Sequence, residues 1–326
     1  MRAPLSMPRG QVAMIDILSI TGPIYIAIAL GWLTTRAGLF ERSDMRVLGR
    51  FVLYVALPAL LFDAVARRPL GDILEWRYMA VFALGGLATM ALGLFWMRRV
   101  AGQAPVASVV QAMGMCCPNS GFVGYPVNLL VLGPVAGVIL GMNMLVENLL
   151  LIPLLLALMD AAAGGGHWRA VVRGAAAGLL RNPMVLALVA GLGAAALGLK
   201  LPAPVEKSVG LFAQASAALS LFVIGGSLAG LGLAGMRRQV AAIAVGKLVL
   251  HPLLTFAALW GLEALGMPPL DAKLRVGVVL AAACPMFGIY PILAQKHGHE
   301  GLAAAALLGT TVASFFTISA ALWVLR

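Results

Sequence analysis

The sequence has 326 residues, of which 62% are hydrophobic and only 11% are charged. Together with a mean hydropathy of +0.99, this composition excludes an ordinary soluble globular fold and indicates a protein of the lipid bilayer. The formal net charge of +11 does not indicate nucleic-acid binding, because the Lys and Arg residues stand in short loops between apolar runs and form no basic stripe.

Apolar runs long enough to cross a bilayer recur from one end of the chain to the other. A hydrocarbon core about 30 Å thick needs about 20 apolar residues per helical crossing. The runs are continuous, whereas barrel strands alternate and have only about 10 residues. We therefore predict an all-α membrane protein with ten transmembrane helices, at 14–35, 46–66, 76–97, 105–131, 134–159, 183–200, 208–231, 239–262, 273–295 and 301–325.

The distribution of basic residues gives a weak signal of orientation. The loop between the first two predicted helices carries Arg36, Arg42, Arg46 and Arg50, and the side opposite to the termini holds slightly more Lys and Arg in total. Since positive loops stay in the cytoplasm, we predict a multi-pass protein of the cytoplasmic (inner) membrane with both termini outside.

The two halves of the chain resemble each other. Pro23, Gly31 and Gly38 recur at one constant offset as Pro183, Gly191 and Gly198. Each half has an odd number of predicted helices, so the second half must enter the membrane with the opposite orientation, as in secondary transporters. We predict inverted repeats at 1–160 and 183–326, joined by a cytoplasmic connector at 161–182. The connector is either an interfacial helix, with Arg169 and Arg173 on one face, or a solvated linker.

A matched pair of segments, 116–126 and 283–291, is the most informative feature of the sequence. Each has Cys-Pro at its second and third positions, glycine three residues after that proline, and Tyr-Pro at its end. The prolines and glycines cannot support an unbroken helix, and backbone groups freed inside a membrane must face protein or water. The alternative is that the prolines merely kink two helices.

An opened helix exposes N–H groups and partial positive charge that suit an anion. Asn119 and Ser120 add side-chain hydrogen bonding at the first break. The candidate substrate-binding residues all lie in the two broken segments. They are Pro118, Asn119, Ser120, Gly121, Pro126, Pro285, Tyr290 and Pro291.

Ionisable and amide side chains inside the predicted spans form a second set of candidates, since they are costly in a membrane. Glu147 lies in the middle of the fifth helix, one turn after Asn143, and Lys247 and His251 share a face of the eighth. The simplest arrangement is a buried Glu147–Lys247 pair in a polar network. That pair either serves transport or only ties helices together, and His251 either titrates or is an interhelical hydrogen bonder.

Cys116, Cys117 and Cys284 fall inside predicted spans, where neither a disulfide framework nor a standard zinc spacing is indicated. We interpret them as packing residues and expect no metal and no cofactor.

These residues resemble the auxin efflux carrier family, whose bacterial members include malonate and malate permeases. The resemblance covers essentially the whole chain. It rests on the fourth helix above all, and its residues are Asn119, Phe122, Gly124 and Pro126, then Asn182-Pro183, Leu221-Phe222, Gly225-Gly226, Lys247, Pro252 and Pro285.

The resemblance implies the fold of the bile-acid sodium symporters. Helices one, two, six and seven would form a scaffold, and helices three to five and eight to ten a transport domain in which helices four and nine cross beside the substrate. In plant PIN-type carriers an asparagine at the crossover contacts the anion, and Asn119 is the matching position. The chain departs from the family in having Ala218 where proline is frequent and Met286 and Phe287 in place of a second asparagine. The second crossover is therefore expected to contribute backbone and shape.

We predict a secondary transporter of a small organic anion, such as a carboxylate, with an elevator-type mechanism. The alternatives are sodium-coupled symport of a bile-acid-like anion, a channel, and a membrane enzyme. No protease, metal or nucleophile motif supports an enzyme, and the scarcity of charges along the spans argues against a channel. The expected partners are the substrate and the bilayer, and small residues such as Gly191 and Gly198 allow a homodimer through the scaffold.

Overall fold

The computed structural model describes residues 9–66, 68, 74–164, 173–174, 177–178, 180–199, 201–230 and 236–325, a part of the chain that is helical and contains no strand. Helices and π-helical or 3-10 turns (η) follow one another in chain order. They are α1 Arg9–Arg36, α2 Arg42–Phe51, η1 Val52–Ala56, α3 Leu57–Ala66, α5 Trp76–Phe95, η2 Trp96–Val100, α6 Pro105–Cys116, η3 Ser120–Gly124, α7 Tyr125–Leu132, η4 Gly133–Val135, α8 Ala136–Val146, η5 Glu147–Leu151, α9 Ile152–Ala162, α11 Pro183–Ala196, α12 Ala203–Leu228, α13 Arg237–Val245, η6 Gly246–Leu250, α14 His251–Ala264, α15 Ala272–Ala283, α16 Tyr290–Gln295 and α17 Glu300–Leu325.

Six helical stretches of the described chain are long and apolar enough to cross a membrane. They are Arg42–Ala66, Trp76–Val100, Ser120–Ala162, Ala203–Leu228, Arg237–Ala264 and Glu300–Leu325. The stretch Ser120–Ala162 has 43 residues, more than the roughly 20 that one crossing needs. The chain turns inside it at Gly133, whose φ is +72°. Two shorter helices, α6 and α11, are also apolar.

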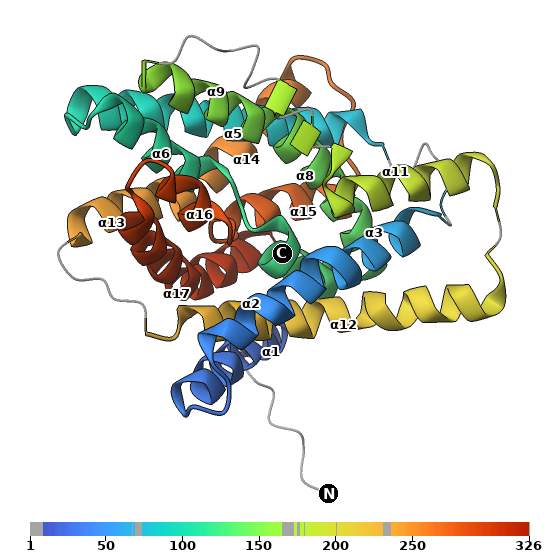
Figure 1. The fold of residues 1–326 in the computed structure, drawn as a ribbon. Coiled ribbons are helices and arrows are strands. Elements are labelled where there is room, and N and C mark those ends of the chain that lie inside the picture. The colour runs from blue at the N-terminus through green and yellow to red at the C-terminus, as the bar shows by residue number, and fades with distance from the viewer. Residues whose placement is uncertain are drawn as a thin grey trace, which may run out of the picture.

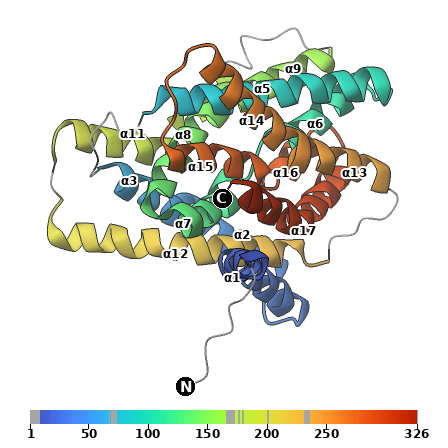
Figure 2. The same ribbon diagram turned by 180° about the vertical axis from the view of Figure 1, so that it is seen from behind.

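The helices fall into two groups (Figures 1 and 2). On one side α2, α3, α11 and α12 lie side by side, with α1 packed against α12. On the other side α5, α6, α9 and α13 to α17 pack together. Between the groups, α8 contacts both α3 and α5, and α7 contacts both α12 and α15.

Glycines let α1 and α12 cross with their backbones in contact. A Cβ atom at Gly31 would overlap the carbonyl oxygen of Phe222, and one at Gly225 would overlap the carbonyl oxygen of Ile28. Small residues at a helix crossing permit this approach, which is how helices pack where lipid supplies no hydrophobic driving force.

Both predicted helix breaks are present. Helix α6 ends at Cys116 and the chain becomes helical again at Ser120, while α15 ends at Ala283 and α16 begins at Tyr290. The predicted end of the sixth span at residue 200 is wrong: α11 stops at Ala196, because Gly198 takes a φ of +59° and Leu199 N–H bonds back to the carbonyl of Ala194. The interfacial helix predicted around Arg169 lies outside the described residues.

π-helical turns precede four prolines inside helices. The turns η1, η3, η5 and η6 are followed by Pro58, Pro126, Pro153 and Pro252. A proline has no N–H and its ring clashes with the carbonyl four residues earlier, so the preceding turn widens. Glu147 is the first residue of η5 and Lys247 lies in η6. Glu147 and Lys247 therefore both lie in turns where the α-helical hydrogen-bond pattern is replaced by the wider π-helical one.

Candidate transport site at the crossing of two broken helices

The two breaks cross and are joined by backbone hydrogen bonds. The N–H of Asn119 donates to the carbonyl of Pro285 over 2.8 Å, and the N–H of Phe287 donates to the carbonyl of Cys117 over 3.2 Å. Pro118 and Met286 form an isolated antiparallel bridge between these bonds. Because Pro118 and Pro285 have no N–H, the donors of the two bonds are Asn119 and Phe287. The crossing is buried in protein, as irregular backbone at membrane depth requires.

Asn119 restarts the first broken helix. Its side-chain oxygen accepts a bond of 3.1 Å from the N–H of Phe122, which makes it an N-cap. Its carbonyl accepts from Gly124 N–H over 2.7 Å. Its side-chain nitrogen, in a residue only 3% exposed, has no hydrogen-bond partner in the described chain. A buried amide donor is thus left unpaired at the centre of the crossing.

Ser120 is bound to Glu147. The hydroxyl of Ser120 donates to Oε1 of Glu147 over 2.5 Å, and both residues are buried. The carboxyl group of Glu147 in η5 therefore holds the first turn after the break.

Lys247 is bound to the second broken helix. Its ammonium group donates to the carbonyl of Ala282 over 2.6 Å and lies 2.9 Å from Nδ1 of His251. Glu147 and Lys247 do not form the direct ion pair that is the simplest arrangement from the sequence, since Glu147 binds Ser120 while Lys247 binds Ala282 and His251. The two residues therefore bind at different breaks: Glu147 reaches Ser120 just after the first, and Lys247 reaches Ala282 just before the second.

The remaining predicted residues lie at or near the crossing in different roles. Asn143 accepts a 2.9 Å bond from the hydroxyl of Tyr78. Tyr290 is fully buried and stacks on Phe287, and its hydroxyl has no hydrogen-bond partner among the residues that the structure describes. The others shape the backbone, with Pro126 and Pro291 in the first turns of α7 and α16 and Gly121 facing Leu57.

Two polar residues of the site, Tyr78 and Asn128, are not among those predicted from the sequence. Tyr78 reaches Asn143, and Asn128 donates to the carbonyl of Gly124 over 2.9 Å, one turn before it. Asn128 is an amide in an apolar span, which is a usable signal. Tyr78 lies near the predicted start of a span, where tyrosine is ordinary, so only the structure identifies it.

One cavity opens between the two helix groups. It has a volume of about 510 Å³ and lies among α3, α7, α8 and α12, lined in part by Asp63, Arg68, Tyr125 and Gln214. Tyr125 is the first residue of α7, which continues the helix that restarts after Asn119. This cavity therefore joins the first break to the boundary between the groups.

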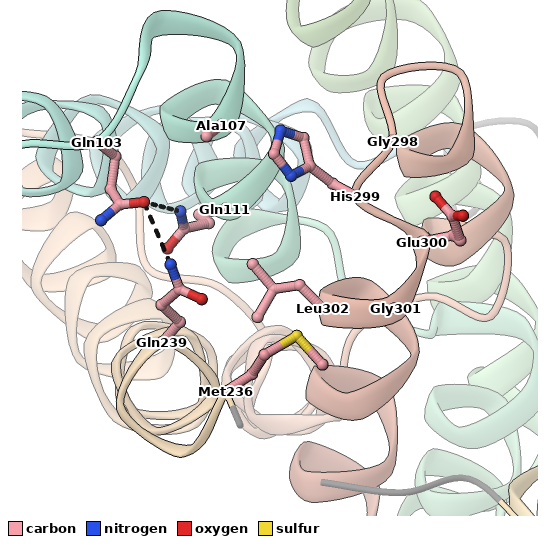
Figure 3. Close-up of a pocket in the computed structure, with 10 residues that line it drawn as sticks. All are labelled: Gln103, Ala107, Gln111, Met236, Gln239, Gly298, His299, Glu300, Gly301 and Leu302. Atoms are coloured by element: carbon pink, nitrogen blue, oxygen red, sulfur yellow. Dashed lines mark hydrogen bonds between the residues drawn. The ribbon is translucent and has the colours of Figure 1, made fainter. Parts of the chain in front are cut away.

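A second cavity, of about 380 Å³, lies inside the other group at the start of α6 (Figure 3). Gln103, Gln111 and Gln239 lie on one side, His299 and Glu300 lie on the other, and Met236 lies at the bottom. The side-chain oxygen of Gln103 accepts bonds from the amide nitrogens of Gln111 and Gln239, at 3.2 and 3.3 Å.

Within the described ranges, no group of three His, Cys, Asp or Glu side chains is placed to hold a metal ion. Cys116, Cys117 and Cys284 are buried and carry free thiols.

Comparison with known proteins gives matches along nearly the whole chain. The model of a family described as "Membrane transport protein" matches residues 17–324. The "Putative malonate transporter" of Rhizobium meliloti (strain 1021) is 31% identical over 323 residues, which cover 96% of this chain and 97% of that protein. The "Uncharacterized transporter YfdV" of Escherichia coli (strain K12) is 25% identical over 322 residues, covering 93% and 95% of the two chains.

Proposed function

Since the chain belongs to the membrane transport protein family, the family of the auxin efflux carriers, and is a membrane transporter and not an enzyme, we propose that it is a secondary transporter of small organic anions. The substrate class is a carboxylate, and a small dicarboxylate such as malonate is the first candidate, because the relative at 31% identity carries the name of a malonate transporter.

The unpaired amide nitrogen of Asn119 carries the substrate assignment. A buried donor without a partner costs about 1–3 kcal/mol, and a carboxylate oxygen satisfies it. The helix that begins at Ser120 adds the first free N–H groups and the positive end of its dipole. With the Glu147 carboxylate engaged by Ser120, the donors of the break remain for the substrate.

The proposed architecture has ten spans in two inverted repeats, 1–160 and 183–326, with the connector 161–182 and both termini outside the cytoplasmic membrane. In it α1, α2, α3, α11 and α12 form the scaffold, and the other helices form the transport domain. Two observations support an elevator-type movement. The crossing is internally tied by backbone bonds, so it can move as one body, and the cavity at Tyr125 lies between the two groups.

Replacement of Asn119 by Ala tests the assignment. We expect uptake of labelled malonate into proteoliposomes to fall at least about tenfold, because one charge-assisted bond contributes about 1.5–3 kcal/mol. Asn148→Ala is the matched control: its amide bonds to Met144 on its own helix and to Asn182, away from the crossing. Undiminished transport by a folded Asn119→Ala protein would refute the site.

The same assay separates the sodium-coupled alternative. Uptake that stops when sodium is replaced by potassium, with bile acids competing against malonate, would select a sodium symporter of larger anions.

A further inference from the structure

Two side-chain contacts join α1 to α17 near the middle of both helices. The hydroxyl oxygens of Tyr25 and Ser314 are 3.2 Å apart, and the Tyr25 ring packs edge-to-face on Phe315 with the ring centroids 4.7 Å apart. The hydroxyl of Ser314 donates its proton to the carbonyl of Thr311 over 2.7 Å. Since a serine hydroxyl has one proton and two lone pairs, Tyr25 is the donor and Ser314 the acceptor of the bond between them.

The two helices belong to different groups. Helix α1 is fixed to α12 of the proposed scaffold, because the backbones of the two helices meet at Gly31 and Gly225. Helix α17 packs against α13, α15 and α16 of the proposed transport domain. The bond from Tyr25 to Ser314 therefore crosses the boundary between the scaffold and the transport domain.

Elsewhere, glycines of the transport domain face apolar side chains of the scaffold across this boundary. At four of them, the atom nearest to an added Cβ is a side-chain carbon of the scaffold, 2.4–3.9 Å away. The pairs are Gly121–Leu57, Gly137–Ala64, Gly141–Leu188 and Gly288–Ile224. Apolar contacts have no preferred direction, so they oppose sliding weakly. A hydrogen bond needs a particular distance and angle, and so it holds the two groups in one relative position.

Ser314 differs from two other buried hydroxyl residues of α17. Thr310 and Thr311 each donate to a carbonyl of their own helix, as Ser and Thr in helices commonly do. Ser314 makes the same kind of bond and in addition accepts from Tyr25. The interior of a membrane has no water to replace a lost partner. Breaking the bond between Tyr25 and Ser314 therefore costs free energy that a bond at an aqueous surface would regain.

We propose that Tyr25 and Ser314 form a latch, which holds the transport domain in the position described here and opens when the domain moves against the scaffold. This inference rests on the proposed elevator-type function. A protein with two positions populates each according to their difference in free energy. Because the latch is closed in one position and open in the other, its removal shifts the balance away from the position described here.

Tyr25→Phe tests the latch, because it removes the hydroxyl and keeps the ring. Spin labels on Val47→Cys in α2 and Leu265→Cys at the end of α14, both exposed sites, report the distance between the two groups in lipid by pulsed electron paramagnetic resonance. The native cysteines are buried and should not take the label. The unmodified protein should show two distances. In Tyr25→Phe the population at the distance of this structure, relative to the other, should fall about two- to tenfold, the weight of one hydrogen bond.

Matched variants separate the bond from the loss of any hydroxyl. Tyr54→Phe, at an exposed tyrosine of η1, should leave the populations unchanged. Ser314→Ala should give the same shift as Tyr25→Phe, and the double variant no larger shift, because all three lack the same bond. Thr310→Val, which removes a buried hydroxyl bonded to its own helix, is the control for Ser314→Ala. Unchanged populations in Tyr25→Phe, or additive shifts in the double variant, would overturn the latch.

Transport of malonate by the same proteins distinguishes a failed latch from a failed function. Two distances that shift in Tyr25→Phe, in a protein that carries no malonate or other carboxylate, would contradict the proposed substrate and support the latch. Normal malonate transport with a single distance in every variant would contradict the latch, because the scaffold and the transport domain would then not move against each other.

Discussion

The hydroxyl of Ser120 donates a 2.5 Å hydrogen bond to the carboxyl group of Glu147, and this bond links the first break to η5. Lys247 does the same for the second break through the carbonyl of Ala282. The two charged residues thus brace the crossing from two sides, and the stability of the crossing should depend on each separately.

Ser120→Ala should destabilise the protein by about 2 kcal/mol, because it leaves a buried carboxyl oxygen of Glu147 without its hydroxyl donor. Thermal unfolding of purified protein, followed by size exclusion after heating, measures the loss. Ser208→Ala is the control, since that exposed serine bonds only to its own helix. In a double-mutant cycle Ser120→Ala and Glu147→Ala should couple by about 1–3 kcal/mol. Additive effects would mean that the bond has no energetic role.

Arg68→Gln should raise the KM for a dicarboxylate a few-fold and leave the maximal rate unchanged. Arg68 lines the cavity between the helix groups, where a positive charge raises the local concentration of anions. The effect should shrink with added salt, because ions screen it over about 8–10 Å. Arg50→Gln, at an exposed site on α2, serves as the comparison. A fall in maximal rate at constant KM would assign Arg68 to the conformational change instead.

Gly31→Ala and Gly225→Ala should each lower stability by about 1–3 kcal/mol, the usual cost of overpacking. In both cases the new methyl group meets the carbonyl of the facing helix, which cannot move aside as a flexible side chain can. Gly193→Ala on α11 has no atom within 4 Å of the added Cβ and should be neutral. The melting temperatures of the three variants measure this difference. Equal values would show that α1 and α12 can move apart to accept the methyl group with no loss of stability.

The membrane helices and the two helix breaks could be predicted from short stretches of the sequence. The apolar runs indicated membrane helices because a bilayer fixes the length of a crossing, and the prolines predicted the breaks because they lack an N–H. Both breaks occur where the sequence placed them. The end of α11 was misplaced because the Gly198 turn competes with a continuous apolar pattern.

Only the tertiary structure decided which groups meet. The sequence showed that Glu147 and Lys247 need partners, since charges in a membrane are costly, but it did not show that Ser120 and Ala282 supply them. Nor did it show that Gln103 gathers Gln111 and Gln239 from two helices. Propensity and hydropathy act over a few neighbouring residues, whereas these contacts depend on how helices distant in sequence cross, and that is set by packing of the whole chain.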